Sequence, residues 1–319
     1  MTPRTAHLRE TLQERLGGLT ITIAPARSKH FEMRALEGAL QTRANVLGVP
    51  VAALDMETAL ANIELALSAG RKGYVCMAAV HGIMEAQRRP EVMRAYTDSL
   101  MALPDGRPAV WVGRLQGHQQ IEQVSGPQVM LEVFRRRAFA PYTHFLYGGK
   151  PGVAQELAAR MSRQFPWARV VGTYTPPFRD LTRQEERHLI ETLCRLRPSI
   201  VWVGISSPRQ ELFMRQYLDR FPTTLMFGVG AAFDFHTGRI RDSAAWIKRA
   251  GLQWLHRLVQ DPKHLFWRYM RTNPAFLWQI GLQLTGLKNY AVQVNTKFAT
   301  AEDVSDCDSS ADLCTPSCG

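Results

Sequence analysis

The sequence of 319 residues lacks the motifs of several large nucleotide-binding enzyme classes. It has no G-x-G-x-x-G fingerprint, which disfavours a nicotinamide-dependent oxidoreductase, and no G-x-x-x-x-G-K-[ST] segment, which argues against a P-loop kinase. Residues 1–300 hold no Asp-x-Asp pair of the sort that binds a divalent metal on a nucleotide diphosphate. A mechanism without a metal is therefore favoured for any phosphate chemistry.

Cysteines and long apolar runs are also scarce. The five cysteines are odd in number and have no metal-ligand spacing, which argues against a disulfide framework or a zinc site. We expect Cys76 and Cys194 to be core thiols, while the other three lie in an acidic, Ser-rich tail. No run approaches the 18 or so apolar residues of a membrane span, and residues 1–18 lack the apolar region of a secretory signal. These absences predict a cytoplasmic protein.

The chain has an excess of positive charge. Its net charge is +11, and the residues after 300 contain five acidic side chains and no basic one. The first 300 residues therefore carry about +16. Such a basic body predicts a polyanionic partner or surface, which leaves nucleotide phosphates, anionic lipid and nucleic acid as candidates.

Short apolar runs alternate with amphipathic stretches over most of the chain. We expect strands at 74–78, 144–147, 170–174, 200–205 and 224–229, and helices at 56–69, 82–97, 127–138, 152–165, 182–196 and 209–221. Continuous apolar strands separated by helices of this length indicate a parallel sheet that is covered on both faces. The layout predicts an α/β fold with a Rossmann-like, doubly wound, mainly parallel sheet.

Composition divides the chain into four segments. They are a polar leader (1–45), expected to be partly ordered, a Rossmann-like core (46–238), a basic and aromatic helical appendage (239–290) and an acidic tail (291–319), expected to be disordered. The appendage could be a solvated helical face or a nucleic-acid-binding surface, but its aromatic residues have the spacing of an amphipathic helix rather than a stacking platform. Binding to a membrane surface fits this pattern best.

The stretch 200–214 reads I-V-W-V-G-I-S-S-P-R-Q-E-L-F-M, a strand followed by a turn and the start of a helix. In an open α/β sheet, ligands bind beyond the carboxyl ends of the strands, so Arg209, Gln210 and Glu211 are candidate ligand contacts. Amide and carboxylate groups there could hold sugar hydroxyls, and a helix N-terminus favours anions. Ordinary helix capping by Ser207, with Pro208 at the first helical position, is the alternative explanation.

Other candidate residues also follow predicted strands or apolar runs. Asp105, in L-P-D-G, could act as a general base, although Asp-Gly is also a common tight turn. A close approach to a phosphate could occur at three glycines: Gly148, Gly149 and Gly230. His81 lies just past a strand, where a lone histidine is more often structural than a ligand, and no second residue has metal-ligand spacing to it.

These motifs together resemble the WecG/TagA/CpsF glycosyltransferase family (glycosyltransferase family 26). The similarity extends from about residue 46 to residue 277, and no single motif is decisive. Its strongest parts are V-W-V-G-I-S-S-P-R-Q-E at 201–211, G-V-G-A-A-F-D-F-H-T-G at 228–238 and R-A-G-L-Q-W-L-H-R-L at 249–258, together with L-P-D-G at 103–106. Their order along the chain makes the resemblance specific.

The resemblance implies an inverting glycosyltransferase of cell-surface or exopolysaccharide biosynthesis. It would move a sugar of the N-acetylmannosamine type, a glucose or a uronic acid from a UDP-sugar to a polyprenyl-diphosphate-linked saccharide, with no metal or other cofactor. The implied location is the inner face of the plasma membrane, on anionic lipid, without nucleic acid as a partner. Family members can also associate into homo-oligomers.

The resemblance also assigns roles to individual residues. Asp105 looks like the general base that deprotonates the acceptor hydroxyl, and Gln210 looks like a substrate contact near the donor. Three arginines of the appendage, Arg249, Arg257 and Arg268, would meet the diphosphate, since a guanidinium can bind a phosphate through two hydrogen bonds.

The chain departs from the family pattern at three places. Family members usually show Thr-x-Asn where this chain has Met77-Ala78-Ala79, Glu-Arg where it has Glu122-Gln123, and Asp where it has Gln128. An alternative function is therefore a catalytically impaired paralogue that acts as a membrane-associated binding subunit. The presence of Asp105 and Gln210 favours an active enzyme.

Overall fold

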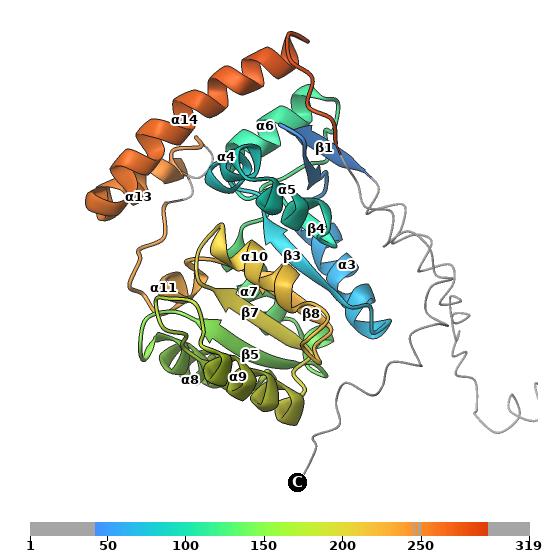
Figure 1. The fold of residues 1–319 in the computed structure, drawn as a ribbon, viewed down its shortest axis with the longest axis vertical. Coiled ribbons are helices and arrows are strands. Elements are labelled where there is room, and N and C mark those ends of the chain that lie inside the picture. Colours follow the sequence, from blue (N-terminus) through green and yellow to red (C-terminus); the bar gives the residue numbers. More distant parts are fainter. Residues whose placement is uncertain (1–41, 245, 248–249, 293–319) are drawn as a thin grey trace, which may run out of the picture. The chain divides into compact units, whose positions relative to one another are not determined.

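The computed structural model describes residues 42–244, 246–247 and 250–292, and its centre is an eight-stranded sheet (Figure 1). The strands are β1 (Arg43–Val46), β2 (Val49–Ala52), β3 (Gly73–Met77), β4 (Met101–Leu103), β5 (Thr143–Gly148), β6 (Arg169–Tyr174), β7 (Ile200–Gly204) and β8 (Leu225–Gly228). Their order is β1-β2-β4-β3-β8-β7-β5-β6, and all pairs are parallel except the β1–β2 hairpin. The predicted α/β class and mainly parallel sheet are confirmed.

Helices connect the strands and bury the faces of the sheet. They are α3 (Met56–Ser68), α4 (Val80–Arg88), α5 (Pro90–Thr97), α6 (Arg107–Leu115), α7 (Gly126–Arg135), the short 3₁₀ helix η1 (Arg137–Phe139), α8 (Val153–Gln164), α9 (Arg183–Leu196), α10 (Arg209–Tyr217), α11 (Ala232–His236), α13 (Gln253–Gln260) and α14 (Pro262–Leu284). Every residue of the central strands β3 and β8 is buried. Burial of both faces explains why these strands are continuous apolar runs rather than alternating ones.

The expected single helix over 82–97 is wrong, because the chain forms α4 and α5 there. Arg89, between them, has an extended backbone with φ −131° and ψ 106°. A residue that precedes proline is pushed out of the helical region by the proline ring, and Pro90 then begins α5, where its missing N–H costs nothing. The prediction also omitted β1, β2, β4 and α6. Of these, β4 is only three residues long.

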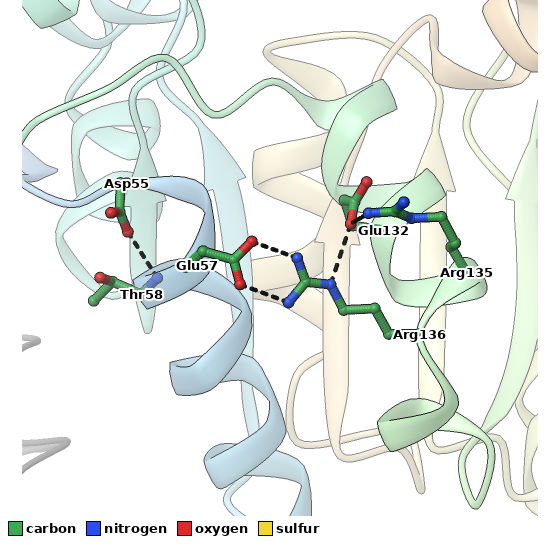
Figure 2. A network of polar contacts seen from close by, with 6 residues as sticks. All are labelled: Asp55, Glu57, Thr58, Glu132, Arg135 and Arg136. Atoms are coloured by element: carbon green, nitrogen blue, oxygen red, sulfur yellow. Dashed lines mark hydrogen bonds and ion pairs between the residues drawn. The ribbon is translucent and has the colours of Figure 1, made fainter.

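A polar network joins the first helix of the core to α7 (Figure 2). Asp55 caps α3 by accepting from the Thr58 backbone N–H at 2.8 Å. Both terminal nitrogens of the Arg136 guanidinium donate to the Glu57 carboxylate, and its Nε donates to Glu132 at 3.1 Å. Exposed ion pairs each contribute only about 0.2–1 kcal/mol, so this network adds modestly to stability where it links α3 to the end of α7.

The C-terminal helix α14 is held to the core by side-chain amides near its end and by an apolar face. Gln283 accepts from the Leu47 N–H at 2.9 Å and donates to the Asn45 carbonyl at 2.8 Å, so α14 is tied to the β1–β2 hairpin. The buried face of α14 also packs on α4 (Figure 1), and consists of Leu265, Tyr269, Thr272, Phe276 and Ile280. Pro274 lies inside this continuous helix.

Candidate active site

Loops that follow four neighbouring strands surround a cavity of about 670 Å³. Strands β4, β3, β8 and β7 lie side by side in the sheet, so their carboxyl ends meet at one edge. The appendage helices α13 and α14 complete the wall, which includes Met77, His81, Asp105, Ser207, Gln210, Gly230, Arg257, Arg268 and Tyr269. The volume lies within the 300–1,000 Å³ that is usual for small-molecule sites.

Of the acidic residues that line this cavity, Asp105 has the clearest chemical role. It follows β4, and Gly106 beside it has φ 118°, a conformation that directs the chain into α6. Burial raises the pKa of the half-buried Asp105 to about 6, and the charge of Arg257 opposes that rise. The carboxylate is thus ionised at neutral pH and still basic enough to accept a proton from a hydroxyl.

Cationic and imidazole groups enter the cavity from the appendage and from α4. The Arg257 guanidinium lies 5.6 Å from the Phe235 ring centroid, and the Arg268 guanidinium lies 5.4 Å from that of Tyr269. The Arg268 Nε and the His81 Nδ1 are buried without a hydrogen-bond partner. Burial lowers the pKa of His81, and the charge of Arg268 lowers it further, which favours neutral imidazole.

Gln210 lies in the cavity wall, but its amide is occupied by bonds within the protein. Its Nε2 donates to the Gly228 carbonyl at 2.8 Å and to Glu211 Oε1 at 3.1 Å, and its Oε1 accepts from the Gly230 N–H at 3.0 Å. Both amide hydrogens are used, and the side chain is only 2% exposed. Gln210 therefore fixes the loop after β8, and its role as a direct substrate contact stays a prediction.

The alternative explanation of this segment, capping of α10 by Ser207, is wrong. Pro208 is the N-cap residue rather than the first helical residue, and no side chain caps the helix. The Ser207 hydroxyl oxygen is buried without a hydrogen-bond partner, and a Cβ added at Gly82 would lie 3.1 Å from it. The absence of a side chain at Gly82 thus leaves room for Ser207 beside α4.

Gly82 also gives space to the Tyr96 hydroxyl, which a Cβ at that position would approach to 2.1 Å. We expect Gly82→Ala to lower the free energy of unfolding by about 1–3 kcal/mol, as overpacking a filled core does, even though alanine favours a helix over glycine by about 1 kcal/mol. Urea unfolding measures the change. Gly281→Ala is the matched control, since nothing lies within 4 Å of a Cβ there, and it should not destabilise. Equal stability of Gly82→Ala and the parent chain would contradict the packing.

Several predicted contacts lie away from the described cavity wall. Gly148 packs against the backbone of Gly204 so closely that a Cβ would come within 2.4 Å of its carbonyl oxygen, which is a structural reason for glycine. Neither Gly148, Gly149, Arg209 nor Glu211 lines the cavity. Arg209 is exposed and lies over the Phe178 ring at 5.5 Å. Arg249 lies outside the described residues, as do the three tail cysteines, whereas Cys76 is buried as expected and Cys194 is partly exposed.

The structure adds cavity residues that the motifs did not single out. Tyr269 and Trp254 pack edge to face at 5.9 Å and form an aromatic wall on the appendage side. Gln123 donates to Gln253 at 2.9 Å, which joins the loop before α7 to the start of α13. The aromatic content of the appendage hinted at the first contact, but the second joins residues 130 apart in sequence, which no local pattern reveals.

The described residues contain neither a membrane-spanning helix nor a cluster of metal ligands. No helix in the ranges 42–244, 246–247 and 250–292 is both long enough and apolar enough to cross a membrane. In the same part of the chain, no group of three or more histidine, cysteine, aspartate or glutamate side chains is arranged to hold a metal ion.

Known proteins are similar to this chain over more than half of its length. The sequence model of the glycosyl transferase WecG/TagA/CpsF family matches residues 44–290. An N-acetylglucosaminyldiphosphoundecaprenol N-acetyl-beta-D-mannosaminyltransferase of Bacillus subtilis is 28% identical over 182 residues, which are 56% of this chain and 68% of that protein. The protein of the same name from Bacillus spizizenii is 25% identical over 193 residues, 60% of this chain and 72% of the relative. The chain belongs to the WecG/TagA/CpsF family of glycosyltransferases.

Proposed function

We propose that this glycosyltransferase moves a sugar from a UDP-sugar to a polyprenyl-diphosphate-linked saccharide. The observation that carries the proposal is Asp105, a carboxylate with a raised pKa inside a cavity that α13 and α14 close. The names of the Bacillus relatives, which act on a diphosphoundecaprenol-linked N-acetylglucosamine, support an acceptor of the same class here. N-acetylmannosamine, glucose and a uronic acid remain the proposed donor sugars.

In the proposed mechanism, the ionised Asp105 takes the proton from the acceptor hydroxyl as its oxygen attacks the anomeric carbon of the donor. The bond from that carbon to the UDP oxygen breaks on the opposite face, so the configuration inverts. Negative charge builds up on the departing diphosphate, where Arg257 and Arg268 supply guanidinium groups without a metal. The neutral His81 adds a hydrogen-bond donor to the same wall.

Membrane docking through α14 is part of the proposal. The buried apolar face of α14 packs on the core, yet its opposite face exposes Phe266, Trp267, Met270, Leu277, Trp278 and Leu284. Lys263 and Arg271 are exposed on the same helix. A helix that is apolar on two sides with cations beside the exposed side suits an interfacial position on anionic lipid, which would bring the lipid-linked acceptor to the cavity mouth.

Release of UDP tests the proposal. Purified full-length protein is incubated with each of the proposed UDP-sugars and a polyprenyl-diphosphate-linked N-acetylglucosamine in anionic vesicles. We expect UDP to form with one donor, only when the acceptor is present, and equally in the presence of EDTA. Binding of donor or acceptor without any transfer would instead support the catalytically impaired binding subunit, and loss of activity with EDTA would contradict the metal-independent mechanism.

A further inference from the structure

Glu211 is a buried carboxyl group directly behind the cavity wall. Its side chain is 0% exposed and does not line the cavity, whereas Ser207 and Gln210, on either side of the α10 start, both do. Its Oε1 accepts from Gln210 Nε2 at 3.1 Å, and Gln210 in turn bonds the backbone of Gly228 and Gly230. Glu211 therefore connects to the wall only through other residues.

The second carboxyl oxygen of Glu211, Oε2, lacks a hydrogen-bond partner. Glu211 Oε2 and Ser207 Oγ are both buried without a partner at hydrogen-bond geometry, although Ser207 is close enough to lower the pKa of Glu211. A buried oxygen that lacks a hydrogen bond costs about 1–3 kcal/mol, and the Ser207 hydroxyl has a single hydrogen to donate. Tyr96, whose pKa Ser207 also lowers, donates its own hydrogen to the Met77 carbonyl, so the Tyr96 oxygen can accept the Ser207 hydrogen. A proton on Oε2 supplies the missing donor toward Ser207.

The surroundings of Glu211 disfavour its charge. Cys76 and Tyr74 face it from β3 and Tyr96 faces it from α5, and each of these groups has its own pKa raised by burial and by the Glu211 carboxyl. Arg215, on the same helix α10, is paired with Asp98 at 2.8 Å. Burial raises the pKa of Glu211 to about 7, and no cation contributes to that value.

We infer that Glu211 is a positioning residue that works in its protonated form and holds Ser207 and Gln210 in the cavity wall from behind. Ionisation leaves Glu211 able only to accept from Ser207, whose hydroxyl hydrogen must then turn away from Tyr96, and places a negative charge behind a wall that, under the proposed function, receives a donor diphosphate. Activity must then fall at alkaline pH as Glu211 loses its proton, while Asp105 needs to lose its own proton at lower pH.

The test compares the parent chain with Glu211→Gln and Glu211→Ala in full-length protein. Glutamine keeps an acceptor for Gln210 and a donor for Ser207 without a titrating proton. We expect kcat/KM for the donor in the parent chain to fall above about pH 7, toward tenfold per pH unit, and Glu211→Gln to lose this alkaline fall while keeping activity within about threefold at pH 6. Glu211→Ala should lose tenfold or more at every pH. Glu191→Gln, at an exposed position of α9, should behave like the parent chain.

A second measurement needs no substrate and separates this inference from the proposed function. The pKa of Glu211 is higher in the folded chain, about 7, than its ordinary 4.5, so the folded state binds the extra proton and loses stability as pH rises from about 4.5 to 7. The difference between the thermal unfolding midpoint of Glu211→Gln and that of the parent chain should therefore increase in favour of the variant from about pH 4.5 to 7. Above pH 7 this difference should stay constant. A constant difference, or a glutamine variant as inactive as the alanine variant, overturns the inference. If neither the parent chain nor the variants release UDP, the proposed function fails, and the pH dependence of unfolding alone tests the inference about Glu211.

Discussion

Asp105→Asn should lower kcat by about 10²- to 10⁴-fold, which is the range that a positioned general base contributes. Asparagine has nearly the same shape as aspartate but cannot take the proton of the acceptor hydroxyl. The parent chain should also lose activity as the pH falls through about 6, because protonation of Asp105 removes the base. UDP release at pH 7.5 and the pH profile of kcat are the measurements.

The stability of Asp105→Asn provides the control for that loss. The pKa of Asp105 is raised from its usual 3.8 to about 6 in the folded chain. The folded state therefore favours the proton, and Asp105 contributes less stability as pH rises between these values. At pH 7.5 the asparagine variant should unfold at the same temperature as the parent chain or higher. Parent-like activity in a well-folded Asp105→Asn would remove Asp105 as the base.

Replacing Trp267 and Trp278 together by glutamate should weaken binding to anionic vesicles by at least about 100-fold. These two side chains are 77% and 70% exposed on α14. Each large apolar side chain contributes about 1.5–3 kcal/mol when it leaves water, and 1.4 kcal/mol is a factor of ten in affinity. The added carboxylates would also be repelled by the lipid. Co-sedimentation with vesicles that contain phosphatidylglycerol measures the change.

The control for the membrane experiment is Phe178→Glu. Phe178 is 99% exposed but follows β6, apart from the appendage, so its replacement should leave vesicle binding unchanged. Transfer to a water-soluble, short-chain acceptor should persist in the Trp267/Trp278 variant, because neither tryptophan lines the cavity. Equal loss of binding in the Phe178 and tryptophan variants would show nonspecific adsorption rather than docking through α14.

Local patterns predicted the central strands and most helices. The strands are buried on both faces and are therefore continuous apolar runs, whereas the helices bury one face and are therefore amphipathic. β3, β5, β6, β7 and β8 coincide with the expected apolar runs to within one residue at each end. The break at Arg89-Pro90 was also readable from the proline, although the prediction passed over it. By contrast, β4 is only three residues long and its pairing with β2 and β3 depends on distant strands, so no local pattern could reveal it.

The sequence by itself determined the fold class, the family and Asp105 as the candidate base, because periodicity and motif order are local properties of the chain. The tertiary structure decided which polar residues share a cavity. It put Arg257 and Arg268 in the same cavity as Asp105, and it moved Glu211 from a candidate contact to a buried group behind the wall. Residues that are adjacent in sequence, such as Gln210 and Glu211, point to different surroundings on a helix. The burial of each side chain depends on the residues that pack around it in the folded chain. Because burial favours the neutral carboxyl group, the protonation of Glu211 depends on that packing too.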